Sequence, residues 1–286
     1  MKLVSFRVEG RSSYGVVDGT TVADVGAGLA STYRDLKAVL ADAQGIARLA
    51  DASASAPRIS LDAIAFEPVI PNPGKVFCIG HNYEEHRVEM ARAKTQFPAV
   101  FLRFADSEVG HGQDAWIPAE SREIDYEGEL AVVIGKGGRR IPKAEALNHV
   151  AGYSCFNDIS VRDWQRHTTQ FTAGKNFPRT GAFGPWIVTA DAIGDPQTLD
   201  LTTRLNGQVM QQSNTAQMIF PVAEIIEYLS TFTHLAPGDV IASGTPGGVG
   251  VRREPQVFLK PGDVVEVEIA RIATLRTTLV AEPAAV

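Results

Sequence analysis

The chain has 286 residues, of which 44% are hydrophobic and 21% are charged, so it can bury a sizeable core as one large domain or as a large and a small domain. The formal net charge is −6 and no basic stripe stands out in the sequence, which argues against a nucleic-acid partner. No run of 18 apolar residues is present, so we expect no membrane span.

The first residues, Met-Lys-Leu-Val-Ser-Phe-Arg-Val-Glu, contain no apolar core of the length found in signal peptides. The two cysteines, Cys78 and Cys155, are far apart and lie in apolar runs, as is typical of buried thiols in a reducing compartment. We therefore expect a cytoplasmic protein.

Residues 1–67 are expected to form a small N-terminal α/β domain. Apolar and polar residues alternate at its start, as in a half-buried strand, and Asp18-Gly19 predicts a β-hairpin. An uneven apolar stripe predicts a helix over residues 34–50, and the Ala- and Ser-rich segment 52–57 indicates a loop.

The remaining residues, 68–286, are expected to form a second, β-rich domain. Strands are predicted at 76–79, 100–104, 130–134, 152–156, 186–189, 199–205, 240–242 and 264–274, and helices at 83–94, 143–148, 160–170 and 220–231. Pro-Gly-Asp-Val occurs twice, at 237–240 and 261–264, and each copy predicts a turn that leads into a strand. Because the strands follow one another without regular helices between them, the pattern favours an α+β fold over a doubly wound sheet.

Two glutamates precede one of these apolar strands. Glu127 and Glu129 are two residues apart, so an extended chain points both side chains to the same face. Two adjacent carboxylates repel unless a positive charge neutralises them, and hard divalent cations such as Mg²⁺ and Ca²⁺ prefer carboxylate oxygen. The alternative is that both glutamates lie on a solvated face of the strand.

A further acid, Asp158, ends the next apolar strand, where it is able to complete a three-carboxylate site or to cap the helix that follows. Ser160 and Asp163 have the spacing of a loose capping box at the start of that helix. Arg162 and Gln165 are three residues apart, so a helix places them on one face.

A possible general base lies in the helix predicted after the strand at 76–79. His86 and Glu89 are three residues apart, and a carboxylate beside a histidine orients its ring and makes it more basic, which suits activation of water. The crowding of charges in this segment also fits an ordinary solvated helix. Lys175, among Gly, Phe and Pro residues, is either an oxyanion-stabilising group or a loop lysine.

Several common catalytic motifs are absent from the sequence. The Gly-rich run at 243–250 lacks the Lys of a phosphate-binding P-loop, although its backbone N–H groups or Thr245 could bind a carboxylate. No Gly-x-Ser-x-Gly, His-Glu-x-x-His or Cys-x-x-Cys is present, which argues against a serine hydrolase and against a zinc site.

Six motifs taken in order resemble the fumarylacetoacetate hydrolase family, over about residues 70–275. They are Gly80-His81-Asn82-Tyr83 with His86-x-x-Glu89, Asp125-Tyr126-Glu127-Gly128-Glu129-Leu130, Asp158-x-x-x-Arg162-Asp163-x-Gln165, Ala173-Gly174-Lys175, Phe183-Gly184-Pro185-Trp186 and Gly244-Thr245-Pro246-x-Gly-Val-Gly. The resemblance implies a catalytic domain of mixed, rolled β-sheets behind a smaller N-terminal domain, and a homodimer.

The resemblance also implies roles for individual residues. It places a divalent ion, Mg²⁺ or otherwise Mn²⁺ or Ca²⁺, on Glu127, Glu129 and Asp158. It makes His86 and Glu89 the water-activating pair. The remaining matched residues line the site as groups that contact substrate or oxyanion: Lys175, Arg162, Gln165 and Thr245.

The chain departs from the family pattern in two places. Arg103 stands where many members have Lys, and Pro178-Arg179 stands where many have Asp-Thr. Both positions are expected near the pocket, with Arg103 contacting the substrate, so the resemblance leaves the substrate open.

These features predict a metal-dependent hydrolase acting on a carbon–carbon bond in a ketonic substrate. Its substrate is expected to be a small 2-oxo acid: an acylpyruvate or 2,4-diketo acid, such as fumarylpyruvate or a diketo sugar acid, cleaved to pyruvate and a second acid. The alternative within the family is a decarboxylase, tautomerase or dehydratase of a 2-oxo acid such as oxaloacetate. A non-catalytic metal- or ligand-binding module is the alternative outside it.

Overall fold

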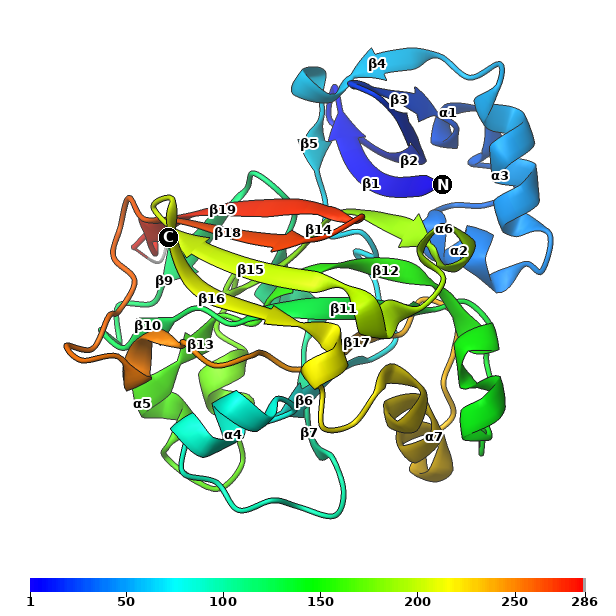
Figure 1. Ribbon diagram of the computed structural model, residues 1–286. Helices are drawn as coiled ribbons and strands as arrows, with labels where there is room; N and C mark the ends of the chain where they lie inside the picture. The colour runs from blue at the N-terminus through cyan, green and yellow to red at the C-terminus, as the bar shows by residue number, and fades with distance from the viewer. Residues whose placement is uncertain (285–286) are drawn as a thin grey trace.

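The computed structural model describes residues 1–284, which form one large and two smaller β-sheets with short helices around them (Figure 1). The large sheet has 12 strands. Its main path runs in the order β4 (Arg58–Ser60), β3 (Thr21–Asp24), β2 (Arg11–Asp18), β1 (Lys2–Val8), β14 (Gly181–Thr189), β12 (Val150–Asn157), β11 (Gly128–Ile134), β17 (Val240–Ala242), β6 (Val76–Gly80) and β7 (Ala99–Arg103). The short strands β5 (Ala65–Phe66) and β8 (Glu108–Val109) pair with β1 and β14.

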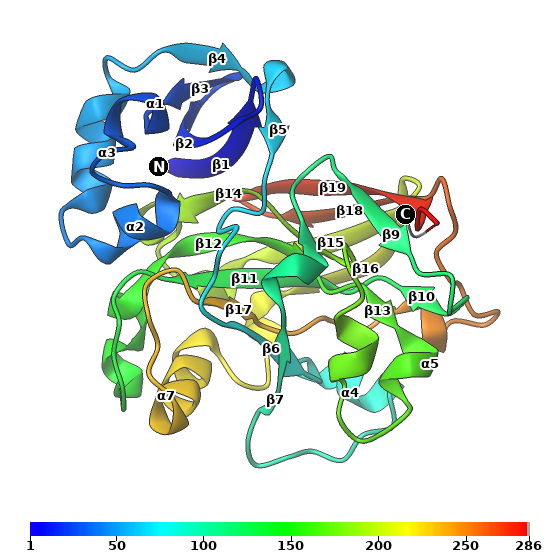
Figure 2. The same ribbon diagram turned by 180° about the vertical axis from the view of Figure 1, so that it is seen from behind.

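The second sheet has five strands and lies beside the centre of the first (Figures 1 and 2). Its order is β16 (Gln208–Asn214), β15 (Asp200–Leu205), β18 (Val264–Ile269), β19 (Ala273–Ala281) and β9 (Asp114–Ile117). A third sheet pairs β10 (Ile124–Asp125) with β13 (Ser160–Val161). Most neighbours are antiparallel, but β6, β8 and β9 each pair in parallel.

The helices are short and lie at the edges of the sheets. The α-helices are α1 (Gly26–Leu29), α2 (Leu36–Ala41), α3 (Gly45–Ser53), α4 (Glu84–Glu89), α5 (Arg162–Gln165), α6 (Ala190–Ile193) and α7 (Val222–Phe232). The 3₁₀ turns are η1 (Leu61–Ala63), η2 (Ala105–Ser107), η3 (Lys143–His149), η4 (Thr172–Lys175), η5 (Pro196–Thr198), η6 (Thr215–Gln217) and η7 (Gly250–Arg252). The expected β-rich α+β fold with mixed sheets is therefore confirmed.

The central strands are buried because both of their faces are covered. All residues of β11 and β12 are buried, as expected for apolar runs between two packed layers. Both copies of Pro-Gly-Asp-Val form the predicted turns, with Gly238 at φ +80° before β17 and Gly262 at φ +93° before β18. The first turn leads into the fully buried β17, and the second leads into β18, where buried and half-buried residues alternate.

The N-terminal segment contains the predicted hairpin, in which Asp18 of β2 pairs with Thr21 of β3. The single helix expected over residues 34–50 is wrong, because it divides into α2 and α3. Asp42 ends α2 in an extended conformation and its carboxylate accepts the N–H of Gln44, a local bond that competes with the helix. Helix α3 continues to Ser53, into the segment expected to be a loop.

Three further expectations need correction. The predicted strand 264–274 is two strands, β18 and β19, joined by a turn in which Arg271 has φ +65°. The helices expected over 83–94 and 160–170 are the single turns α4 and α5. The capping box at the start of α5 does not form, since the Ser160 hydroxyl donates to the carbonyl of Asp158 and α5 has no side-chain cap.

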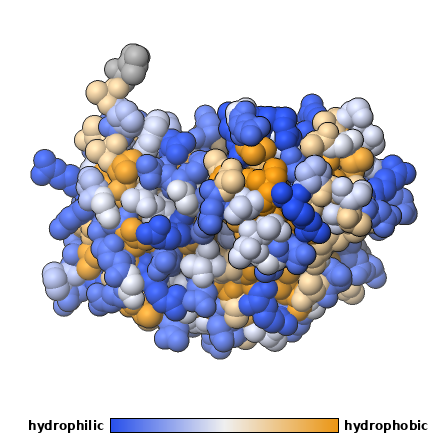
Figure 3. Space-filling view, turned by 90° about the horizontal axis from the view of Figure 1, so that it is seen from above, coloured by the Kyte–Doolittle hydropathy of each residue, from blue (hydrophilic) through white to orange (hydrophobic). Residues whose placement is uncertain are grey.

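The expected boundary between residues 67 and 68 does not interrupt the large sheet. Strand β1 pairs with β14 through Lys2–Val188 and Leu3–Ile187, so the N-terminal strands extend the large sheet. The division into two domains stays a prediction. On the surface, hydrophilic side chains mix with smaller apolar groups (Figure 3), and no helix within residues 1–284 has the length and apolarity needed to cross a membrane.

Candidate active site

The pairing of β11 with β12 brings the predicted metal ligands together. Gly128 lies opposite Asn157, so Glu127, just before β11, and Asp158, just after β12, lie at the same end of the pair. Glu129 follows one residue into β11. Each of the three acids offers a carboxylate oxygen within 4.8 Å of the others, and all three residues are buried.

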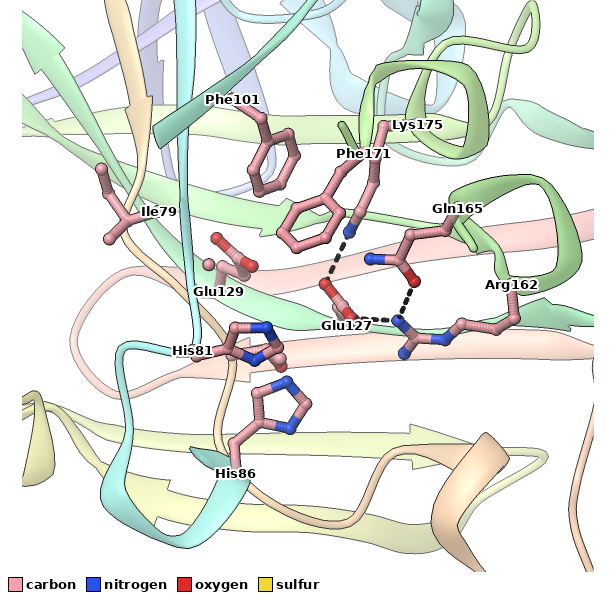
Figure 4. Close-up of a pocket in the computed structure, with 12 residues that line it drawn as sticks. Ile79, His81, His86, Phe101, Glu127, Glu129, Arg162, Gln165, Phe171 and Lys175 are labelled. Carbon is pink, nitrogen blue, oxygen red and sulfur yellow. Dashed lines mark hydrogen bonds and ion pairs between the residues drawn. The ribbon is translucent and has the colours of Figure 1, made fainter. Parts of the chain in front are cut away.

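Three cations contact these acids, Lys175, Arg162 and Arg103, and Figure 4 shows the first two beside Glu127. The Lys175 ammonium lies 2.7 Å from Glu127 Oε2 and 2.7 Å from Asp158 Oδ2. Arg162 lies 2.7 Å from Glu127 Oε1 and donates through Nε to Asp125 Oδ2 at 2.8 Å. Burial by itself raises the pKa of Glu127, but the charges of Lys175 and Arg162 outweigh it and hold that pKa below its ordinary value.

Glu129 differs from the other two acids because no cation within residues 1–284 pairs with it. Its carboxylate accepts a hydrogen bond from the N–H of Gly244 at 2.8 Å. Burial, together with the nearby charges of Asp158 and Glu127, raises the pKa of Glu129 well above its ordinary value. This carboxyl group is therefore the member of the triad that most needs a positive neighbour.

The balance of buried charge fits a divalent cation at this point. Within residues 1–284 the cluster contains more carboxylates than cations: Asp125, Glu127, Glu129 and Asp158 against Arg103, Arg162 and Lys175. The carboxylate oxygens that accept hydrogen bonds keep a second lone pair. An all-oxygen donor set is the one that Mg²⁺, Mn²⁺ and Ca²⁺ prefer.

Arg103 is close to this cluster but does not line the cavity. Its guanidinium donates to Asp158 Oδ1 at 2.7 Å, to the carbonyl of Ile159 at 3.1 Å and to the hydroxyl of Thr180 at 3.1 Å. In this position Arg103 holds the carboxylate of Asp158 in one orientation. Its expected contact with the substrate stays a prediction.

The expected water-activating pair forms one side of the site. His86 Nδ1 lies 3.3 Å from Glu89 Oε2, and Glu89 in turn accepts the N–H of Gly248 at 3.0 Å. A carboxylate fixed in this way orients the imidazole ring. His86 is buried and lines the cavity, whereas Glu89 supports it from behind.

A second histidine, His81, was not predicted as a site residue. Its ring stacks on that of His86, with the ring centroids 5.5 Å apart, and neither ring nitrogen has a hydrogen-bond partner in the described part of the chain. Burial, with a smaller contribution from His86, lowers the pKa of His81 to about 4, so it is neutral at pH 7. The sequence did place His81 in a motif shared with the family, directly after β6, and this position could have identified it as a site residue.

The cavity above the triad is narrow, at about 20 Å³, which is room for an ion or a water. The Thr245 hydroxyl there donates to the carbonyl of Gly128 and accepts from Gln211, while Gln165 accepts from Arg162 at 3.0 Å. Phe101 and Phe171 form an apolar wall that the sequence did not reveal (Figure 4). The predicted residues that line the cavity are His86, Glu127, Glu129, Arg162, Gln165, Lys175 and Thr245.

This buried, oxygen-rich centre in a β-rich fold belongs to a known class of protein. Residues 75–280 match the model of the fumarylacetoacetate (FAA) hydrolase C-terminal domain, and the chain belongs to the fumarylacetoacetate hydrolase family. The resemblance inferred from the six motifs is therefore confirmed.

Individual relatives carry different activities in their names. The chain is 43% identical over 221 residues to the mitochondrial oxaloacetate tautomerase FAHD2A of Bos taurus, covering 77% of this chain and 70% of the relative. It is 35% identical to the fumarylacetoacetate hydrolase of Exiguobacterium antarcticum, with a TM-score of 0.85 over 99% of this chain and 100% of the other.

A third relative was solved with ligands. Maleylpyruvate hydrolase from Sphingobium sp. SYK-6, in complex with manganese (II) ion and pyruvate, is 29% identical, with a TM-score of 0.83 over 98% of this chain and 99% of the other. The family thus includes hydrolases and tautomerases. Because the tautomerase relative is mitochondrial, the cytoplasmic location of this chain stays a prediction.

Proposed function

We propose that the protein is a metal-dependent hydrolase that cleaves an acylpyruvate or a related 2,4-diketo acid into pyruvate and a second acid. The observation that carries the proposal is the supported pair of His86 and Glu89 on one side of the buried triad, 3.3 Å from nitrogen to oxygen. A hydrolase needs a base for water beside the group that activates the substrate. The relative solved with manganese and pyruvate supports this reading.

Glu127, Glu129 and Asp158 are the residues that would hold the cation. When bound, Mg²⁺ or Mn²⁺ would supply the Lewis-acid charge that polarises the oxygens of a 2-oxo acid. Lys175 and Arg162 keep Glu127 ionised at neutral pH, which preserves the donor set. Arg103 fixes the orientation of Asp158.

The side chains of this protein would divide the reaction between them. His86, oriented by Glu89, removes a proton from water, and the resulting hydroxide adds to the carbonyl two carbons from the 2-oxo group. The bond between that carbonyl carbon and the carbon that separates the two carbonyl groups then breaks. The separating carbon takes a proton, which gives pyruvate, and the carbonyl that accepted hydroxide becomes the second acid. Lys175 stabilises negative charge that develops on oxygen, and Phe101 and Phe171 shield the site from bulk water.

A second candidate function is the interconversion of keto and enol forms of oxaloacetate, favoured by the 43% identical tautomerase. That reaction needs a proton-transfer group and no attacking water, so the same His86 would serve both reactions.

A homodimer is also proposed from the family resemblance, and sedimentation of the native protein would test it.

The experiment that separates these functions is a substrate panel followed by NMR. Native protein with Mg²⁺ is incubated with acylpyruvates, diketo sugar acids and oxaloacetate. Release of pyruvate and a second acid supports the hydrolase, whereas enol–keto conversion of oxaloacetate without cleavage of any acylpyruvate supports the tautomerase. Turnover of none of these compounds would contradict both.

Two variants assign the roles of the residues in the same experiment. His86→Asn is expected to lower turnover about 10²–10⁴-fold and to leave Mg²⁺ affinity in calorimetry within about threefold. Glu129→Gln is expected to lower Mg²⁺ affinity and turnover together. His149→Asn is the matched control, because that histidine is half-buried outside the site and its ring hydrogen-bonds, within residues 1–284, only to the carbonyl of Lys136. Full turnover in His86→Asn would show that the base is misassigned.

A further inference from the structure

A larger cavity of about 410 Å³ opens beside the narrow one above the triad. The two share His81, Arg162, Gln165 and Phe171 in their linings, so they lie next to each other. We call the larger one the arginine vestibule, because three more arginines line it: Arg92, Arg166 and Arg252.

The arginine vestibule is positively charged although the whole chain has a net charge of −6. No acidic residue of the described part of the chain lines it. Arg166 has an ion-pair partner in Glu123. Arg92 and Arg252 have no ion pair within residues 1–284, and Arg252 contacts only the sulfur and the carbonyl oxygen of Met90, at 3.3 Å each.

Two guanidinium groups without carboxylate partners form a site for an anion. Arginine presents several N–H donors in a plane and binds carboxylate through two parallel hydrogen bonds. The neighbouring hydroxyls of Thr168 and Thr169 and the amide of Gln256 also line this space. Its lining is therefore polar and suited to a charged group.

Size places the two parts of a substrate in different cavities. The space at the triad, about 20 Å³, is too small for more than the ion and the atoms next to it. Two larger cavities border it: the arginine vestibule, and a space of about 220 Å³ that shares Gly80, His81 and Phe171 with it. The vestibule suits the charged remainder of a bound 2-oxo acid better, because four arginines line it. The charge it meets there is positive.

We propose that Arg92 and Arg252 bind a second carboxylate at the far end of the substrate, so that the enzyme selects extended 2-oxo dicarboxylates over monocarboxylates. This inference rests on the proposed function in one respect, since it takes the 2-oxo end to lie at the triad. The two arginines are specificity-determining residues, because the reacting atoms lie at the other end of the molecule.

The test uses two 2-oxo acids that lack the 4-oxo group and so bind without being cleaved. 2-Oxoadipate and 2-oxohexanoate have the same carbon chain length and differ by a terminal carboxylate in place of a methyl group. Calorimetry with the full-length protein and Mg²⁺ is expected to show at least tenfold tighter binding of 2-oxoadipate. In R92Q/R252Q this preference should fall to threefold or less, with the affinity for 2-oxohexanoate unchanged.

A matched control separates a local contact from the loss of positive charge. Arg122 is exposed, has no ion pair within residues 1–284 and does not line the arginine vestibule, so R122Q should keep the full preference. Native protein that binds both acids equally would overturn the proposal, and so would a double variant that loses affinity for both acids alike.

The outcomes also distinguish this proposal from the proposed function. Mg²⁺-dependent binding of both acids with equal affinity would remove the second carboxylate site and leave the metal-dependent function in place. Arginine-dependent preference for 2-oxoadipate without any effect of Mg²⁺ would keep the anion site and contradict the metal-dependent function. Failure of both acids to bind would overturn both.

Discussion

Lys175 is the residue on which the charge balance of the triad depends. Its buried ammonium contacts two carboxylates, those of Glu127 and Asp158, at 2.7 Å each. Burial favours the neutral amine, but these two acids outweigh it and raise the pKa of Lys175 above its ordinary value. The lysine is therefore a structural charge as well as a candidate oxyanion group.

Lys175→Met is expected to destabilise the metal-free protein by about 3–5 kcal/mol, because it leaves buried carboxylates without their partner. Mg²⁺ should recover part of this loss, since a ligand that binds only the folded state stabilises it. Urea unfolding with and without Mg²⁺ measures both effects. Lys136→Met is the control at an exposed lysine without an ion pair in the described chain, and a loss below about 1 kcal/mol in Lys175→Met would contradict this account.

Glu108 carries a second prediction, based on pH. It is buried, and neither carboxylate oxygen has a hydrogen-bond partner among residues 1–284. Burial raises the pKa of Glu108 to about 8 despite the opposing charge of Arg103. The folded protein thus holds a proton that the unfolded chain releases near pH 4.5. The contribution of protonated Glu108 to the free energy of unfolding is complete below pH 4.5 and is lost as the pH rises to 8. The loss is up to about 1.4 kcal/mol per pH unit.

Glu108→Gln removes this titration while keeping the shape of the side chain. The variant should be close to the native protein in stability at pH 5 and exceed it at pH 8, by an amount on the order of 3 kcal/mol. Urea unfolding at the two pH values gives the comparison. A variant that is less stable than the native protein at pH 8 would show that the ionised carboxylate is stabilising.

At the scale of elements, the loop after β17 links the strand edge to the triad. Gly244 in this loop has φ +103°, and its N–H donates to Glu129. A Cβ atom at this position would lie 2.6 Å from Cβ of Asn82 and 2.9 Å from the carbonyl oxygen of Ile79. Both the backbone conformation and the space therefore require glycine.

Gly244→Ala is expected to cost about 2 kcal/mol or more in unfolding free energy, from strain and crowding together. It should also weaken Mg²⁺ binding at least tenfold, because the hydrogen bond to Glu129 moves. Gly28→Ala is the matched control, since nothing lies within 4 Å of an added Cβ there. Equal Mg²⁺ affinity in both variants would show that the hydrogen bond from Gly244 does not support metal binding.

The sequence predicted the elements that local patterns specify. The apolar runs predicted β6, β11, β12 and β17. The family resemblance singled out Glu127, Glu129 and Asp158, which the pairing of β11 with β12 brings together, and their role as metal ligands stays a prediction. The lengths of the short helices were overestimated. In the segment 34–50, the hydrogen bond from the N–H of Gln44 to the carboxylate of Asp42 marks the place where the first helix ends.

Other parts of the site depend on sheet order, which no local pattern contains. Arg103 reaches Asp158 across 55 residues of sequence, and Glu108 is buried because β8 pairs in parallel with β14. The arginine vestibule likewise combines separate segments around residues 92, 166 and 252. These contacts depend on the three-dimensional arrangement of the strands, which a local sequence pattern does not specify.

At the scale of the whole molecule, one apolar core joins the N-terminal segment to the catalytic sheet. Leu3, Leu36 and Leu49 pack in the same cluster as Phe156 and Ile187, and β1 continues the sheet through β14. A shared core of this kind predicts one cooperative unfolding transition for residues on both sides of the expected boundary.

Leu49→Ala tests this cooperativity from the N-terminal side. Loss of this buried leucine of α3 should cost about 2–5 kcal/mol, and the transition followed by tryptophan fluorescence should shift with it. The test uses a Trp186→Phe background, because Trp186 lies 4.8 Å from Lys2 Nζ and would report the junction directly. Trp116 and Trp164 then report the catalytic segment.

Asp51→Ala, at an exposed position of the same helix, serves as the control and should leave the transition in place. A fluorescence transition that stays unchanged in Leu49→Ala would show that the N-terminal segment unfolds on its own. That result would support two independent domains.

The bonds that residues 248–251 donate have a consequence for synthesis on the ribosome. Glu89 depends on the N–H of Gly248, and Asp125 depends on those of Gly250 and Val251. A nascent chain that has emerged only to residue 240 carries all three acids of the triad but cannot fix the carboxylates that support His86 and Arg162. Translation that stops at this point therefore leaves the carboxylates of Glu89 and Asp125 without these backbone donors.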